Sequence, residues 1–167
     1  ALALDRVLGL RFDVGIFTNL TQDHLDFHKT MEAYRDAKGK LFTQCKTGIV
    51  NLDDAAAAHF LRTGTCAFQT YSVERNDGMY LARFLKLKSD RVEMDVVNGN
   101  EICRFELGIP GRFTVYNALA VIAAARSLGV SMEQIASALR QAHGVKGRVE
   151  VVPTPGMPYT VLIDYAH

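Results

Sequence analysis

Three short apolar runs, each followed by polar residues, dominate the first part of the chain. They cover residues 14–18, 48–52 and 67–71. Each run has the length and composition of a buried β-strand, and each ends where the hydrophobic pattern breaks. The first part of the chain is therefore expected to contribute three core strands to one sheet.

Helical patterns separate these strands. A helix capped by Thr30 is expected to run to about Cys45, because helix-forming residues follow the threonine hydroxyl. A second helix is expected over residues 55–61, capped by Asp53 or Asp54. Strands that alternate with helices predict an α/β fold, a mostly parallel sheet flanked by helices.

The pattern changes over about residues 72–107. Three runs there alternate apolar and polar residues, and Asn98-Gly99-Asn100 separates the last two. Asn-Gly between such runs is a strong hairpin signal. The runs cover residues 80–87, 92–97 and 102–107. This part is predicted to be an antiparallel β-subdomain attached to the α/β part.

The last third returns to helices. Residues 115–128 are apolar on almost every side, so this helix is expected to be buried on most of its surface and to end at Gly129. Ser131 is expected to cap the next helix, which runs to about Gln141. Two short strands then follow, over residues 149–152 and 160–163.

Composition narrows the class of protein. The chain has 167 residues, 49% hydrophobic and 22% charged, with a net charge of +1. This balance favours binding to neither nucleic acid nor an anionic membrane, and no apolar run approaches the length of about 20 residues that spans a bilayer. No signal peptide is expected, since Asp5 and Arg6 interrupt the apolar start.

The cysteines and the chain ends add two expectations. Cys45, Cys66 and Cys103 are odd in number and widely spaced, which favours reduced thiols, a cytoplasmic location and no structural zinc site. A monomer is expected. The chain starts without a methionine and stops directly after a strand, so it is expected to be part of a longer protein.

Potentially reactive side chains are concentrated in residues 18–28. This segment contains Asp23, His24, Asp26 and His28 directly after the first predicted strand. Imidazoles and carboxylates at this spacing can bind a divalent cation, but a helix start capped by an aspartate, with histidines at its surface, is an equal alternative. Sequence chemistry also does not distinguish Lys38 from Lys40 on the helix that follows.

Three further residues could contact a ligand. Asn117 lies at the start of the apolar helix, where its amide could bind a purine, although a capping role is the usual one. Arg148 follows a glycine and could bind phosphate or form a surface ion pair. Asp164 ends the last strand, where it could accept a hydrogen bond from a ribose or cap a further element.

Four motifs together resemble one family. The segment from Asn19 to Lys38, then Gly111 to Leu119, Gly147 to Glu150 and Asp164 to His167 resemble the central, ATP-binding domain of the Mur ligases, in the same order. The resemblance covers essentially the whole chain. It is closest to the MurE-type branch, which adds the third amino acid, meso-diaminopimelate or L-lysine, to UDP-N-acetylmuramoyl-L-alanyl-D-glutamate in peptidoglycan synthesis.

The resemblance implies a P-loop NTPase-like fold and ATP-dependent amide bond formation through an acyl phosphate, with Mg²⁺ to offset phosphate charge. It implies that His24 binds magnesium and that Lys38 is a carbamylated lysine that orients the metal. It also implies that Asn117 contacts adenine, Arg148 the ATP phosphates and Asp164 the ribose. Arg6 matches an arginine that contacts the muramoyl-peptide substrate.

The chain also departs from the family pattern. No Gly-rich P-loop motif is present, and the family's metal-binding glutamate would precede Ala1. By this resemblance, residues 160–167 are expected to be the start of the link to a C-terminal domain. Thr114 stands where the family usually has asparagine, which puts one nucleotide contact in doubt. Without the phosphate-binding loop and the acceptor domain, this segment alone is expected to be inactive.

Three alternatives stay open. A folylpolyglutamate- or cyanophycin-type ligase would share the fold and the metal chemistry. A metal-dependent hydrolase would use His24, Asp26 and His28 around a tightly bound transition metal. A binding module without catalysis would need none of these groups.

Overall fold

A single mixed sheet organises the molecule. The computed structural model describes residues 2–21 and 30–165. Among these residues the main sheet has six strands in the order β1-β2-β3-β4-β5-β6. The strands are β1 Phe12–Phe17, β2 Cys45–Asn51, β3 Ala67–Ser72, β4 Tyr80–Leu87, β5 Val92–Asn98 and β6 Glu101–Leu107. Strands β1 to β4 pair in parallel, and β4 to β6 pair antiparallel.

The predicted α/β fold with an antiparallel part is confirmed. The antiparallel strands extend the parallel sheet rather than forming a separate one, because β3 pairs with β4 through Tyr71 and Tyr80. The β5–β6 hairpin turns at Gly99, which has the positive φ of 59° that such a turn needs. The register of β4 against β5 shifts between Arg83 and Lys86.

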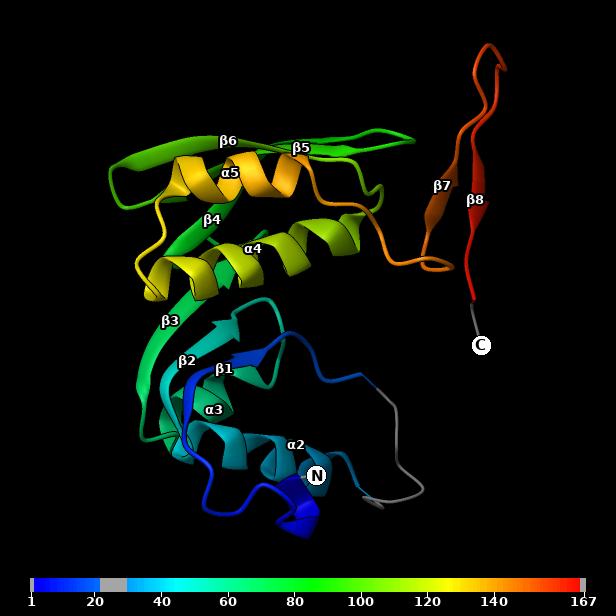
Figure 1. Cartoon of the computed structure of the whole chain (residues 1–167). Helices are drawn as coiled ribbons and strands as arrows, with labels where there is room; N and C mark the ends of the chain where they lie inside the picture. The colour runs from blue at the N-terminus through cyan, green and yellow to red at the C-terminus, as the bar shows by residue number, and fades with distance from the viewer. Residues whose placement is uncertain (1, 22–29, 166–167) are drawn as a thin grey trace.

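Consecutive residues of β2 show how the helices cover the sheet. Ile49 belongs to a core cluster with helix α4, whereas Val50 belongs to a second cluster with Phe42 and Phe60. Neighbouring strand residues point to opposite faces, so helices cover both faces here. The helices are α2 Met31–Gly39, the 3₁₀ helix η2 Lys40–Thr43, α3 Ala57–Thr63, α4 Arg112–Ser127 and α5 Met132–Arg140. Figure 1 shows α4 and α5 together, away from α2 and α3.

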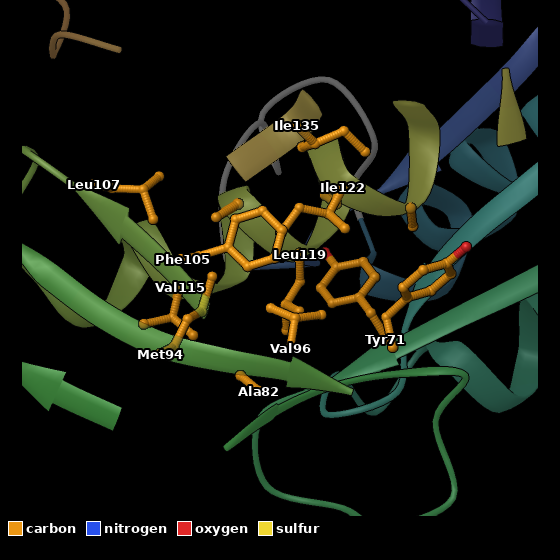
Figure 2. Packing of buried hydrophobic residues seen from close by; sticks show 14 of the residues in the cluster. Tyr71, Ala82, Met94, Val96, Phe105, Leu107, Val115, Leu119, Ile122 and Ile135 are labelled. Atoms are coloured by element: carbon orange, nitrogen blue, oxygen red, sulfur yellow. The ribbon is translucent and has the colours of Figure 1, made fainter. Parts of the chain in front are cut away.

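The larger core lies between α4, α5 and the antiparallel strands. Val115, Leu119 and Ile122 of α4 are fully buried there, and Figure 2 shows them beside Phe105 and Val96 of the strands. Burying one such aliphatic side chain contributes about 1.5–3 kcal/mol. The prediction of a largely buried helix is confirmed for these faces, while Val121 remains 47% exposed.

The predicted helix from Thr30 to Cys45 is too long. The Thr30 cap is confirmed, because its side chain accepts a hydrogen bond from the Ala33 amide. The helix ends at Gly39, and Cys45 already begins β2. The 3₁₀ turn between them places Phe42, 1% exposed, against Phe60. Burial of this ring therefore redirects the chain toward the sheet before the helical pattern ends.

The later boundaries agree more closely with the sequence. Ser131 forms a capping box with Gln134, as its spacing predicts. Helix α3 starts at Ala57 without a side-chain cap, two residues later than predicted. The last two strands form a hairpin, β7 Glu150–Val152 with β8 Val161–Ile163, which stands beside the main sheet in Figure 1. None of the helices in the described part of the chain is both long and apolar enough to cross a membrane.

Candidate active site

Polar groups gather where the parallel strands end. Because β1, β2 and β3 run in the same direction, the loops after Phe17, Asn51 and Ser72 meet at one edge of the sheet. Asn51 is 5% exposed and donates from Nδ2 to the Thr18 carbonyl at 2.9 Å. Its Oδ1 accepts from the Asp53 amide at 3.0 Å. Both ends of this buried amide are therefore used to hold the loops together.

Two neighbouring aspartates extend this network. Asp54 accepts from the Leu20 amide at 2.7 Å and from the Ala56 amide at 2.8 Å, so it joins the loop after β1 to the approach to α3. Asp53 accepts from the Val73 amide at 2.7 Å and from the Ser72 hydroxyl. The prediction that one of them caps the next helix is wrong, because α3 begins at Ala57 without a side-chain cap and both aspartates instead tie separate loops together.

A hollow of about 240 Å³ opens between this rim and α4. Asn117 lines it, as its predicted ligand role requires, together with exposed Phe113 and half-buried Tyr116. The other lining residues are Thr18, Asn19, Asn51, Asp53 and Asp54. Burial and the nearby carboxylates of Asp53 and Glu74 raise the pKa of Tyr116, so its phenol stays protonated. An amide beside aromatic rings suits a planar base.

Lys38 approaches the same loop from the other side. Its Nζ donates to the Asn19 carbonyl at 3.0 Å and lies 4.7 Å from the centre of the Tyr34 ring. A second hollow, of about 200 Å³, lies beside it and is also lined by Thr18 and Asn19. Lys38 and Asn117 are thus on two sides of one short loop.

The structure separates the two lysines that the sequence could not distinguish. Lys40 points to the N-terminal segment, where its Nζ lies 3.0 Å from Asp5 Oδ1 and 3.4 Å from the Leu2 carbonyl. Lys38, by contrast, lies at the edge where the parallel strands end. Of these two lysines, Lys38 is the one beside the rim, and its role as a carbamylated lysine stays a prediction.

Arg6 is exposed in the turn that follows the 3₁₀ helix η1, Leu2–Leu4. Leu2 of η1 lines the hollow beside Lys38. The predicted substrate contact of Arg6 therefore stays a prediction.

Arg148 and Asp164 lie close to each other but apart from these hollows. Arg148 donates to the Tyr165 carbonyl at 3.4 Å, and the Tyr165 amide donates to the Gly147 carbonyl at 2.8 Å. Both residues therefore flank the base of the β7–β8 hairpin. Neither is among the residues that line the hollows beside Asn117 and Lys38. Their predicted contacts with ATP stay predictions.

Thr114 does not face the hollow. Its side chain is 3% exposed, and its hydroxyl donates to the Pro110 carbonyl at 3.1 Å. The hydroxyl is therefore used inside the turn that starts α4, and Asn117 is the residue from this helix that offers an amide to the hollow.

The predicted metal ligand lies outside the described residues. His24 falls within residues 22–29, as do Asp23, Asp26 and His28, so both the magnesium site and the hydrolase alternative stay predictions. Within residues 2–21 and 30–165, no group of three histidine, cysteine or carboxylate side chains is placed to hold a metal ion. Lys38 is the predicted metal-orienting group whose position is described.

Sequence reasoning did not find the role of Asn51 or of the Asn19 carbonyl. A polar residue that ends an apolar strand was a signal for the first, since a buried amide there needs partners. The second is a backbone group, and its meeting with Lys38 depends on the path of the loop after β1. No side-chain pattern could have predicted it.

Comparison with known proteins gives a consistent picture. Residues 1–125 match the model of the Mur ligase middle domain. A UDP-N-acetylmuramoyl-L-alanyl-D-glutamate–2,6-diaminopimelate ligase of Bacillus velezensis is 39% identical over 176 residues, which cover 100% of this chain and 36% of the relative. The ligase of the same name from Clostridium botulinum is 41% identical over 168 residues, covering 100% of this chain and 35% of the relative.

Solved structures agree in fold. A structure of a UDP-N-acetylmuramoyl-L-alanyl-D-glutamate–2,6-diaminopimelate ligase superposes with a TM-score of 0.87 at 27% identity, over 100% of this chain and 36% of that one. MurF from Acinetobacter baumannii superposes with a TM-score of 0.81 at 23% identity, covering 91% of this chain and 33% of that one, which shows a shared fold. This chain thus spans about a third of the length of these relatives.

Proposed function

Because this chain belongs to the Mur ligase family, as its middle domain, we propose that the full-length protein is an ATP-dependent ligase of peptidoglycan synthesis. Its substrates would be UDP-N-acetylmuramoyl-L-alanyl-D-glutamate and diaminopimelate, the compounds in the names of the relatives that are about 40% identical. The names favour diaminopimelate over L-lysine.

One observation carries the proposal. Lys38 Nζ donates to the Asn19 carbonyl at 3.0 Å, and Asn117 lines the hollow on the other side of the Thr18–Asn19 loop. A nucleotide that places its base beside Asn117 would pass this loop on the way to Lys38. The same edge of a parallel sheet is where open α/β folds bind nucleotides.

The residues present fit a magnesium nucleotide in two respects. Asn117 is exposed and offers a donor and an acceptor to a base, and Phe113 and Tyr116 supply apolar surface beside it. The hollow beside Lys38 leaves room for a carbon dioxide adduct on its amine. That adduct would turn a cation into an anion that can hold a metal, with His24 as its proposed partner.

When bound, magnesium would offset the charge of the phosphates during transfer to the substrate carboxylate. The chain's own residues would hold the geometry for this step. Asn51 and Asp54 fix the loop after β1, and the loop in turn fixes Lys38 through the Asn19 carbonyl. Arg148 and Asp164 would reach the phosphates and the ribose from the β7–β8 hairpin.

The test is ADP release by the full-length protein with ATP, magnesium and the UDP-N-acetylmuramoyl dipeptide. We expect release that depends on diaminopimelate and is much weaker with L-lysine, glutamate or no acceptor. Preference for glutamate with a folate substrate would indicate a folylpolyglutamate-type ligase instead. Hydrolysis that needs no acceptor amino acid, together with stoichiometric zinc in the purified protein, would indicate a metal-dependent hydrolase.

A further inference from the structure

The last turn of α2 rests on α3. Gly39 ends α2, and a side chain there would begin 3.5 Å from the Phe60 ring, so the ring lies directly against the helix backbone. Phe60 is fully buried, which fixes this face of α3 in the core. The position of Lys38, one residue before Gly39, therefore depends on how α3 holds the end of α2.

A polar contact lies one turn earlier on the same helix. His59 Nε2 is 3.1 Å from Asp36 Oδ1, and the His59 side chain is only 19% exposed. The Asp36 carboxylate also accepts from Arg35 Nε at 3.2 Å, so its orientation is restricted from two directions. This close approach of nitrogen and oxygen joins α2 to α3 by a polar contact.

A series of aromatic contacts connects His59 and Phe60 of α3 to Lys38. The His59 ring meets the edge of Phe60 at a centroid distance of 5.7 Å, and Phe60 meets Phe17 at 4.5 Å. The centre of the Phe17 ring lies 5.9 Å from Lys38 Nζ. Helix α3 is thus connected to Lys38 by two routes. One is the contact of Phe60 with the backbone of α2 at Gly39, and the other is the Phe17 ring beside the amine.

We infer that His59 is a positioning residue for Lys38, acting through its polar contact with Asp36. By holding the end of α2 on α3, it keeps the Lys38 amine at the Asn19 carbonyl and beside the two rings. The inference rests on the proposed function only for its consequence in catalysis. The positioning itself can be measured without any activity.

The experiment is competitive labelling of lysines in the full-length protein with a trace of an acetylating reagent, in buffer depleted of carbon dioxide. The readout is the labelling rate of Lys38 relative to Lys46, whose side chain is 75% exposed and lies on β2. In His59→Ala this ratio should rise about threefold, the scale expected for loss of one partly exposed polar pair. Asp36→Ala should give a similar rise, and the double variant should add little to either.

Two further variants separate positioning from a general loss of stability. His59→Gln keeps a nitrogen donor that can reach Asp36 and should restore most of the ratio. His143→Ala changes an exposed histidine in the loop after α5 and should leave the ratio unchanged. An unchanged ratio in His59→Ala, or an equal rise for every lysine, would overturn the inference. Failure of the wild-type protein to release ADP would overturn the proposed function and leave the labelling result standing.

If the ligase proposal holds, the same variants make a kinetic prediction. His59→Ala should lower kcat about as much as the labelling ratio rises, with the KM for the acceptor amino acid unchanged. A rise in that KM with an unchanged kcat would contradict a role through Lys38.

Discussion

The buried side chain of Asn51 donates to the backbone carbonyl of Thr18 at 2.9 Å and thereby joins the ends of β1 and β2. This bond fixes the loop that separates Lys38 from Asn117. The candidate site therefore depends on a buried residue whose side-chain amide is used to join two loops.

Replacing Asn51 with leucine should destabilise the protein by about 1–3 kcal/mol, because the Thr18 carbonyl and the Asp53 amide lose a buried partner. The free energy of unfolding from urea titration measures this loss. Asn100→Ala, in the exposed turn after β5, is the matched control and should change stability by less than about 0.5 kcal/mol. Equal effects of the two variants would contradict the role of Asn51.

Replacing Gly48 with alanine tests the packing of β2 against Phe42, where the chain passes from α2 into the sheet. A side chain at this glycine would begin 2.7 Å from the Phe42 ring and 2.8 Å from Cys66 Sγ. Gly48→Ala should therefore cost about 1–3 kcal/mol of unfolding free energy. Gly108→Ala is the control, because no atom lies within 4 Å of the added carbon there. Thermal unfolding of the two variants should differ clearly, with only Gly48→Ala shifted strongly downward.

The raised pKa of the Cys45 thiol predicts that the protein loses stability at alkaline pH. Burial, with a smaller contribution from Cys66, raises the pKa of the Cys45 thiol from 9.0 to about 12. The unfolded chain thus loses this proton first, and the stability that the buried thiol contributes is lost as the pH rises from about 9 towards 12. Urea unfolding of the wild type and Cys45→Ala at about pH 8 and about pH 10.5 should show a smaller decline for the variant. Identical declines would contradict the burial of a protonated thiol.

Asn117→Ala tests the proposed base contact. The residue is exposed on α4, so the variant should fold with nearly unchanged stability. Loss of one or two hydrogen bonds to the base should raise the KM for ATP about three- to tenfold, with a smaller change in the KM for diaminopimelate. Steady-state ADP release with each substrate varied in turn provides both values. An unchanged KM for ATP would place the base elsewhere.

Much of the fold could be predicted because its signals are local. The hairpin at Gly99, the capping box at Ser131 and the apolar helix α4 each follow from neighbouring residues. The end of α2 could not be predicted so well, since it depends on the burial of Phe42 against a helix that follows β2 in the chain. Tertiary packing there outweighs the helical propensity of the residues after Gly39.

The candidate site also combines features that the sequence predicts with features that depend on tertiary contacts. The resemblance to a family predicts a role for Lys38, the position of Asn117 at a helix start already suggests one, and the structure places the two residues on two sides of one loop. The different surroundings of Lys38 and Lys40 depend on contacts between segments far apart in the chain, which no local pattern contains. Arg148 and Asp164 lie together at the hairpin, and their approach to the nucleotide stays a prediction.

Removal of the Lys38 amine tests the proposed catalytic site most directly. ADP release dependent on diaminopimelate should fall about a hundredfold or more in full-length Lys38→Ala, and a short-chain carboxylate should restore part of it. Lys46→Ala, which removes an exposed amine paired with Asp13, should keep nearly full activity. If Lys38→Ala were as active as Lys46→Ala, Lys38 would have no part in catalysis, and the site proposed around the Thr18–Asn19 loop would be wrong.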